Sequence, residues 1–431
     1  MRFSRTTRRV GALVAGALTV VLALSACSAD SDVTIDLPAQ AEGAFPEATQ
    51  TQLQDAVTHA MAAAGASGAI VGVWAPWSGS WVAGQGTQDV GAGAPVTADM
   101  QFRAGRITRS MTCDVLYEFV EEGRVSLDDS VADYVSGVAD LTDVTLGQLC
   151  DSTSGIGSFS PQLSPLWTSN PTREWNPREL ASYGLGVART GDPGLTFSDS
   201  DAGYVLLGLA LERIGGMSAA ELFEQYISEP LNLEATVLPG DAAAAPGEGP
   251  VLKGSVTRIG EDGAMNCLEP VDVTEISASI GYTDSGVVST VNDLGRYAQA
   301  LATGALVGEE TERFADPKPA TAGAPSWFNT DGGALLVGSL VGQASVVPGY
   351  ASATFADPDS GLTVVVVLNN SASGSGLATA LAWELAALAS KAPAASGETT
   401  PEAGLPWTAE QYHAQIAASA ICPLPEPAPA P

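Results

Sequence analysis

The sequence predicts an α/β fold of the α+β type, with one β-sheet built from both ends of the body and a lobe of helices between them. Short runs of β-type residues occur early, in residues 68–85, and again late, in residues 334–368. Segments with helical periodicity fill most of the interval. Strands at the two ends with helices between them indicate a single sheet closed by both ends of the chain.

The first 26 residues have the pattern of a signal peptide. Arg2, Arg5, Arg8 and Arg9 precede an apolar run over residues 10–24, and small residues stand directly before Cys27. This pattern resembles a bacterial lipobox, which implies cleavage before Cys27 and attachment of lipid to it. We expect an exported protein that is lipid-anchored on the outer face of the bacterial cell membrane. The alternative is an ordinary signal peptide in which Cys27 has no special role.

The composition limits the partners that we expect. Cleavage removes four of the 18 Lys and Arg and none of the 49 Asp and Glu, which leaves 14 basic residues and a net charge near −35 on 405 residues. Such a surface repels nucleic acid and anionic head groups. No later run of apolar residues is long enough to span a membrane, so the lipid on Cys27 would be the only anchor.

The remaining elements follow in order along the chain. Small, acidic residues and prolines in 27–48 predict a flexible tether, and residues 49–390 form the main domain. Within it the expected helices are 51–66, 107–122, a helix beginning at 144–150, 203–214, 293–302 and 377–389. The expected strands are 68–74, 80–85, 334–340, 351–356 and 362–368. A linker at 391–405, a C-terminal helix within 406–422 and a Pro-rich tail at 423–431 complete the chain.

Four cysteines remain in the body after Cys27, namely Cys113, Cys150, Cys267 and Cys422. An even number of cysteines in an exported protein predicts two disulfides, and the sequence alone permits three pairings. A metal site is a poor alternative, because the chain has only two His and no Cys-x-x-Cys spacing. We therefore expect neither a metal nor another cofactor.

Five segments together resemble the serine β-lactamase family and its relatives, the class C β-lactamases and the D-alanyl-D-alanine carboxypeptidases. In chain order they are 102–129 (beginning FRAG and ending VEEGRVSLDD), 144–156 (VTLGQLCDSTSGI), 197–208 (FSDSDAGYVLLG), 285–294 (SGVVSTVNDL) and 348–370 (beginning PGY and ending VVLNN). The resemblance covers about residues 50–390. It implies a penicillin-binding-protein-like fold, a mainly antiparallel sheet flanked by helices plus a helical lobe.

The resemblance also implies a chemistry whose residues are missing. The family uses Ser-x-x-Lys at a helix N-terminus, a Tyr-x-Asn segment and a Lys- or His-x-Gly strand. At these positions the chain has Arg106 and Arg109, Asp199 and Asp201, and Gln343 and Ser345. Arginine does not replace the lysine base, because it stays charged at any working pH.

A relocated nucleophile is the alternative. The chain has three lysines, Lys253, Lys318 and Lys391, and none has a Ser three residues before it. Ser110 is nearest to the lost site but has no evident base, and a serine without a positioned base is a weak nucleophile.

The substituted residues are charged, and the resemblance implies that their segments face each other. We therefore hypothesise that Arg106 and Arg109 pair with Asp199 and Asp201 and plug the former cleft. The alternatives are a polar pocket that binds an envelope ligand without cutting it, and four charges that all face water.

The resemblance implies the disulfide pairing as well. In the family the helices that carry Cys113 and Cys150 pack together, which leaves Cys267–Cys422 as the second pair. The alternative for the first pair is two buried free thiols.

The leading functional interpretation is a non-catalytic member of the family that serves as a binding or scaffold module in the cell envelope. Its expected partner is a peptidoglycan-derived or envelope protein ligand. The competing interpretations are an active β-lactamase, carboxypeptidase or esterase with a relocated nucleophile, and a tether without any ligand.

Overall fold

The computed structural model describes residues 33–138, 141–240, 243–244, 246–247, 249–308, 311–402 and 404–424. The signal segment 1–26, Cys27 and the tail beyond Leu424 lie outside the described residues.

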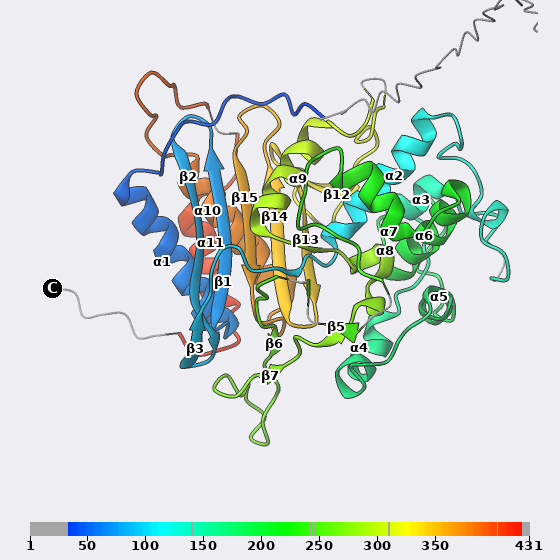
Figure 1. Cartoon of the computed structure of the whole chain (residues 1–431), viewed down its shortest axis with the longest axis horizontal. Coiled ribbons are helices and arrows are strands. Elements are labelled where there is room, and N and C mark those ends of the chain that lie inside the picture. The colour runs from blue at the N-terminus through cyan, green and yellow to red at the C-terminus, as the bar shows by residue number, and fades with distance from the viewer. Residues whose placement is uncertain are drawn as a thin grey trace, which may run out of the picture. The chain divides into compact units, whose positions relative to one another are not determined.

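Within the described residues, nine strands form one antiparallel sheet (Figure 1). In their order across the sheet they are β10 (Lys318–Pro319), β11 (Phe328–Asp331), β12 (Ala334–Val337), β13 (Leu340–Val347), β14 (Tyr350–Ala356), β15 (Thr363–Leu368), β1 (Gly68–Ala75), β2 (Gly79–Asp89) and β3 (Ala92–Pro95). Three small two-stranded sheets pair β4 (Phe102–Arg103) with β9 (Val288–Ser289), β5 (Ala243–Ala244) with β8 (Ile276–Ser277), and β6 (Ser255–Val256) with β7 (Val271–Asp272).

The centre of the large sheet joins the two ends of the domain. β1 and β15 are rich in β-branched residues, and they pair from Ala69 opposite Leu368 to Trp74 opposite Thr363. Both strands are almost wholly buried, which fits their continuous apolar runs. The prediction of a sheet closed by the two ends of the domain is confirmed.

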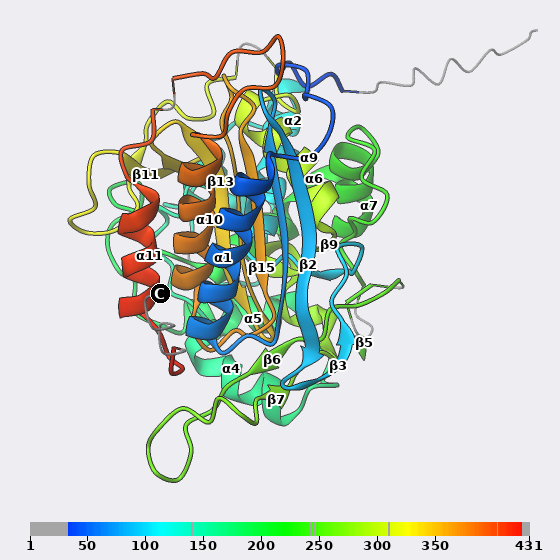
Figure 2. The same cartoon turned by 90° about the vertical axis from the view of Figure 1, so that its left-hand side faces the viewer.

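The helices cover both faces of this sheet. They are α1 (Glu47–Ala64), α2 (Ile107–Glu121), α3 (Leu146–Cys150), α4 (Ser160–Ser169), α5 (Pro177–Leu185), α6 (Asp201–Gly215), α7 (Ala219–Phe223), α8 (Tyr282–Ser285), α9 (Val291–Thr303), α10 (Ser375–Ala389) and α11 (Ala409–Ala418). One-turn segments occur at Val131–Asp133, Glu224–Ser228 and Ala278–Ile280. Helices α1, α10 and α11 lie on one face (Figure 2), while α9 and the lobe of α2 to α8 lie on the other.

Each face of the sheet has its own apolar core. Val71, Val366 and Leu381 belong to the core under α1 and α10, whereas Ile70, Val367 and Met111 belong to the core shared with the lobe. Neighbouring residues of a strand point to opposite faces, so β1 and β15 contribute to both cores. None of the helices in the described part combines the length and apolar character needed to span a bilayer.

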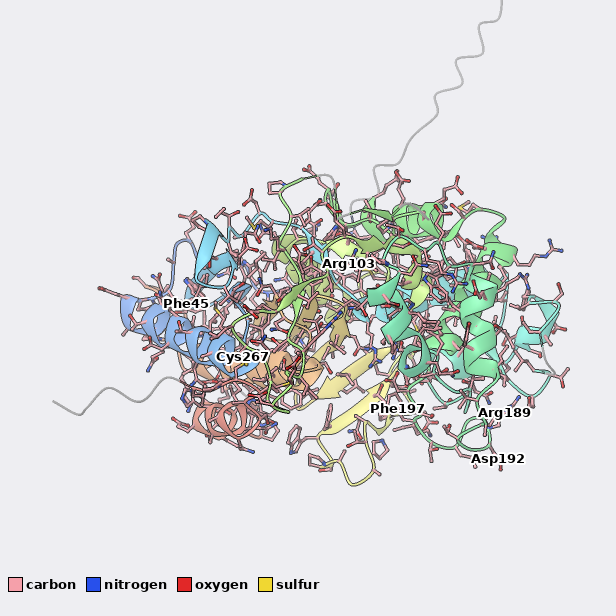
Figure 3. All side chains as sticks on the ribbon, turned by 90° about the horizontal axis from the view of Figure 1, so that it is seen from below. Phe45, Arg103, Arg189, Asp192, Phe197 and Cys267 are labelled. Atoms are coloured by element: carbon pink, nitrogen blue, oxygen red, sulfur yellow. A yellow bond between two sulfur atoms is a disulfide. The ribbon has the colours of Figure 1, made fainter. Side chains whose placement is uncertain are left out.

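Both predicted disulfides are confirmed. Cys113 in α2 bonds to Cys150 at the end of α3, and Cys267 bonds to Cys422 just beyond α11. The second bond ties the C-terminal helix to the loop between β6 and β7 (Figure 3). The described part of the expected tether also contacts the body, because Val33 donates its backbone N–H to Pro230 and Phe45 is 2% exposed.

Several elements of the structure differ from the sequence-based prediction. The run 334–340, expected as one strand, is divided by Gly338 at a φ of +62° into β12 and the start of β13. Helices α4 and α5 were not predicted, since α4 contains Pro165 and neither segment has a long apolar stripe.

Candidate functional site

The N-terminus of α2 presents the two arginines that the sequence analysis aligned with the Ser-x-x-Lys motif of the family. Arg106 is the N-cap residue of the helix and Arg109 follows one turn later, so both side chains lie on one face. The side chain of the N-cap residue makes no capping hydrogen bond, and no residue of the first turn is acidic. A helix N-terminus disfavours a nearby cation, so carboxylates from elsewhere must offset the two charges.

Those carboxylates are Asp199, just before α6, and Asp284 in α8. Asp199 bridges both arginines, with Oδ1 2.7 Å from Arg109 Nη1 and Oδ2 2.8 Å from Arg106 Nη1. Arg109 also donates its Nε–H to Asp284 Oδ1 at 2.8 Å, and its Nη2 lies at the same distance. The guanidinium of Arg109 lies 4.7 Å from the centre of the Tyr204 ring. We call Arg106, Arg109, Asp199 and Asp284 the Arg–Asp cluster.

Burial divides the cluster into a closed and an open half. The side chains of Arg109 and Asp284 are 5% and 4% exposed, whereas those of Arg106 and Asp199 are 26% and 39% exposed. Burial acts to raise the pKa of Asp199, but the charges of Arg109 and Arg106 lower it to about 2. Burial acts to lower the pKa of Arg109, and Asp199 and Asp284 more than offset it. Asp199 and Arg109 are therefore both charged at neutral pH.

The predicted pairing was right for Asp199 and wrong for Asp201. Asp201 is the first residue of α6, and its carboxylate accepts the backbone N–H groups of Phe159 and Ser160 and the hydroxyl of Ser160. Asp201 therefore binds the backbone at the start of α4 and does not pair with an arginine. Burial, followed by the charge of Asp284, raises the pKa of Asp201.

Asp284 and Tyr204 belong to the site but were not among the predicted site residues. Both lie inside or directly beside segments that carried the family resemblance, and this was their only signal in the sequence. The Tyr204 hydroxyl donates to the carbonyl of Cys150 at 2.5 Å and receives a hydrogen bond from Ser152. The ring beneath Arg109 is thus fixed to the disulfide-bonded end of α3.

Gln343 and Ser345 lie on β13, and Ser345 contacts the N-terminus of α2. Gln343 donates to the carbonyl of Gly333 at 2.9 Å. Ser345 is fully buried, and its Oγ accepts the backbone N–H of Arg106 at 2.7 Å. A Cβ added to Gly105 would lie 2.0 Å from this oxygen, so there is no free space between them. The Ser345 hydroxyl thus occupies the position in front of the helix N-terminus.

The other candidate groups for catalysis lie elsewhere. Ser110 donates its hydroxyl to the carbonyl of Gly333 and is fully buried. Lys253 pairs with Asp89, and Lys318 pairs with Asp316. His59 and His413 stack on each other between α1 and α11, in the layer on the other face of the sheet. None of these contacts places a lysine or histidine against Ser110.

A cavity of about 740 Å³ lies beside the cluster. Arg106 and Asp284 form part of its wall, together with Arg103 on β4. Most of the other wall residues are apolar, and they include Trp167 from α4, Ile280 and Val346. The ion pairs of the cluster therefore leave an open space beside them.

The sequence of the chain matches a known protein family. The sequence profile described as "Beta-lactamase" matches residues 53–389, which is most of the chain. The chain belongs to the beta-lactamase family. The likeness includes the five segments that suggested it, and the penicillin-binding-protein-like fold predicted from them is confirmed.

Individual relatives of this family member are distant. It is 28% identical over 219 residues to penicillin-binding protein 4 of Amycolatopsis lactamdurans, covering 48% of this chain and 52% of that one. It is 28% identical over 211 residues to the D-alanyl-D-alanine-carboxypeptidase/endopeptidase AmpH of Escherichia coli, covering 47% and 49%. The chain thus spans about half the length of these relatives. A D-stereospecific amidohydrolase from Streptomyces has a similar fold, with a TM-score of 0.64 at 23% identity over 75% of this chain and 94% of that one.

Proposed function

We propose that this protein is a non-catalytic member of the beta-lactamase family that binds a ligand at the bacterial cell surface. The observation that carries the proposal is the state of Arg109. It stands where the family has its lysine, and it is held between the carboxylates of Asp199 and Asp284. A guanidinium does not give up its proton at working pH, so this position supplies no general base.

The N-terminus of α2 supports the same conclusion. A backbone N–H at a helix N-terminus is a donor that can stabilise an oxyanion in acyl transfer. The N–H of Arg106 is already bonded to Ser345 Oγ. A substrate oxygen would have to displace the buried hydroxyl of Ser345. The side chain of Arg106 is not a nucleophile.

An active hydrolase is the second candidate. The names of the relatives favour it, because they describe a carboxypeptidase/endopeptidase and an amidohydrolase. Activity in this chain would require a nucleophile other than the residue at position 106. Ser110 is the nearest serine along α2, but its hydroxyl is committed to the carbonyl of Gly333.

Intact-mass spectrometry separates the two candidates. Residues 28–431 are incubated for a long period with a penicillin, a cephalosporin and a D-amino acid amide, beside an active class C β-lactamase as the positive control. We expect neither an added antibiotic mass nor a hydrolysed product. An adduct that survives denaturation would overturn the proposal, and the variant Ser110→Ala would show whether Ser110 carries it.

The cavity favours a binding module over a tether without a ligand. Its volume lies within the range of small-molecule sites, roughly 300–1,000 Å³. A domain without a ligand would be expected to fill this space with side chains, because an open cavity loses packing contacts.

We also propose that lipid on Cys27 holds the protein at the outer face of the cell membrane. The signal pattern that ends at Cys27 supports this location. Metabolic labelling with an alkyne fatty acid should mark the full chain and not the variant Cys27→Ser. Equal labelling of both chains would contradict lipidation at this residue, and unlabelled but exported protein would indicate an ordinary signal peptide.

A further inference from the structure

The cavity beside the Arg–Asp cluster is lined mainly by apolar side chains. Trp167 and Ile280 are each 6% exposed and Val288 is 2% exposed, and all three belong to its wall. The Nε1 atom of Trp167 is buried, so the indole ring presents carbon to the cavity. Val346 on β13 and Ala278 belong to the same wall. A wall of this kind favours a ligand with an apolar body.

The charged residues of the wall balance each other. They are two arginines, Arg103 and Arg106, and two acids, Glu234 and Asp284. In Figure 3, Arg103 lies between the strands of the large sheet and the helices of the lobe. Glu234 is exposed and also borders a neighbouring surface depression, so water solvates it at the rim. Among the described residues, the wall therefore has no excess of one charge that would attract an ion.

Three of these charged groups already have partners within the protein. Arg103 donates from Nη2 to the carbonyl of Ile276 at 2.5 Å. Arg106 pairs with Asp199 at 2.8 Å, and two guanidinium nitrogens of the Arg–Asp cluster contact Asp284. An ionic ligand would have to compete with these contacts or lose its water without gaining a counter-charge. Both alternatives cost free energy.

Three hydroxyl groups on the wall also use their hydrogens within the protein. Ser160 donates to Asp201 at 2.5 Å, and Ser164 donates to the carbonyl of Ser160 at 2.7 Å. Thr168 donates to the carbonyl of Pro165 at 3.2 Å. A hydroxyl has a single hydrogen, so these side chains offer no donor to a ligand. A ligand would therefore gain less from hydrogen bonds to them than from apolar contact.

We propose that this cavity binds an uncharged, mainly apolar molecule, which is held by contacts with Trp167, Ile280, Val288 and Val346. This inference rests on the proposed function, because the ligand is held without being cut. A carboxylate of the same shape would meet the two acids of the wall, and an ammonium would meet the two arginines. The uncharged form alone avoids the loss of water from a charged group that gains no partner.

Three competitors with one apolar body test the proposal. N-phenyl-1-naphthylamine, an uncharged dye that fluoresces in apolar sites, is bound to residues 28–431 and displaced at pH 7 by decan-1-ol, decanoate or decylamine, each below its aggregation concentration. The titrations contain 0.5 M NaCl, which shortens the Debye length to about 4 Å and so screens the acidic surface of the chain.

We expect decan-1-ol to bind at least about tenfold more tightly than either ion. A tenfold ratio corresponds to about 1.4 kcal/mol, and an uncompensated charge in an apolar site costs more than that. Decanoate or decylamine that binds as tightly as decan-1-ol would overturn the proposal. So would the absence of binding by the dye and by decan-1-ol.

Two variants and one control place the molecule in the cavity. Val346→Lys adds an unpaired cation to the wall, so the affinity for decanoate relative to decan-1-ol should rise at least about tenfold. Leu195→Lys makes the same change of charge at a side chain that is 67% exposed and outside the wall, so this ratio should stay unchanged. Ala278→Phe fills part of the space and should weaken decan-1-ol at least about tenfold, even if Val346→Lys does not fold. An unchanged ratio in Val346→Lys, or unchanged decan-1-ol binding in Ala278→Phe, would contradict the assignment.

The outcome is distinguishable from failure of the proposed function. If the chain forms an antibiotic adduct, the proposed function fails whatever decan-1-ol does. If decan-1-ol does not bind and the antibiotics leave the mass unchanged, only this inference fails.

Discussion

Two buried ion-pair clusters include residues of helix α2, and they differ in what lies beyond them. In the first cluster, Arg109 contacts Asp199 and Asp284. Asp199 also contacts Arg106, which borders the open cavity. Asp114, one and a half turns later, pairs with Arg313, and both side chains are at most 3% exposed. The second pair is closed on all sides, since Tyr297 donates to Asp114 and Arg313 donates to the carbonyls of Ser110 and Gly332.

The comparison shows that a buried arginine–aspartate pair does not by itself mark a functional site. Both clusters bury charged side chains, and in both the charged groups have several hydrogen-bond or ion-pair partners. Of the two clusters, only the Arg–Asp cluster contributes to the wall of the described cavity, through Arg106 and Asp284. We therefore assign the Asp114–Arg313 pair to stability, while ligand binding beside Arg106 remains the proposal for the Arg–Asp cluster.

The largest expected effect is in the closed pair. Asp114→Ala leaves Arg313 as an uncompensated buried charge, and we expect the free energy of unfolding to fall by about 3–5 kcal/mol. Urea denaturation followed by circular dichroism measures this loss. The double variant Asp114→Leu with Arg313→Met removes both charges and should lose much less. Equal losses in the single and double variants would mean that the burial of charge is not the cause.

A smaller effect is expected at the open cluster. Asp199→Asn should lower the free energy of unfolding by about 1 kcal/mol, because solvent screens a side chain that is 39% exposed and Arg109 keeps Asp284. The same urea titration should show a larger loss for Asp284→Asn, whose side chain is 4% exposed. A loss for Asp199→Asn as large as that for Asp114→Ala would remove the distinction between the two clusters.

The pH dependence of Asp199 provides an independent check. Its pKa falls from 3.8 to about 2 on folding, so its contribution to stability is present above pH 3.8 and is lost as the pH falls toward 2. Between pH 6 and pH 3 the stability of the unchanged chain should therefore approach that of Asp199→Asn. A difference between the two chains that stays constant down to pH 2 would contradict this assignment.

The smallest effect is expected at an exposed pair. Arg189 contacts Asp143 through two nitrogens, but the two side chains are 34% and 55% exposed. Asp143→Asn should change the free energy of unfolding by less than about 1 kcal/mol, and 0.5 M salt should remove the difference. A larger effect that persists in salt would show that side-chain exposure does not determine how much each ion pair contributes to the free energy of unfolding.

The sequence predicted the elements that have strong local patterns. The apolar run of α10 and the β-branched runs of β1 and β15 lie where they were expected. Helix α2 was predicted to within one residue of its end at Glu121. These segments can be predicted from the sequence because a buried helix or strand must be apolar along most of its length. Helix α4 was missed because its stability comes from contacts such as the Asp201 carboxylate on its first N–H groups.

Within the candidate site, the sequence identified the positions but only part of the pairing. Asp199 and Asp201 stand two residues apart and carry the same charge, so composition gave no reason to separate them. The start of α6 between them turns Asp201 toward Phe159 and leaves Asp199 facing the arginines. Asp284 completes the cluster from a helix 175 positions away from Arg109.

By itself, the sequence determined the family, the charged residues Arg106, Arg109 and Asp199 and the absence of any Ser-x-x-Lys pair. Only the tertiary structure decided which carboxylates neutralise Arg106 and Arg109, that Ser345 occupies the N–H of Arg106, and that a cavity remains beside them. The physical reason is that identity and local pattern are properties of the chain. Ion pairing and enclosed space depend instead on the directions in which side chains from distant elements point once they are packed.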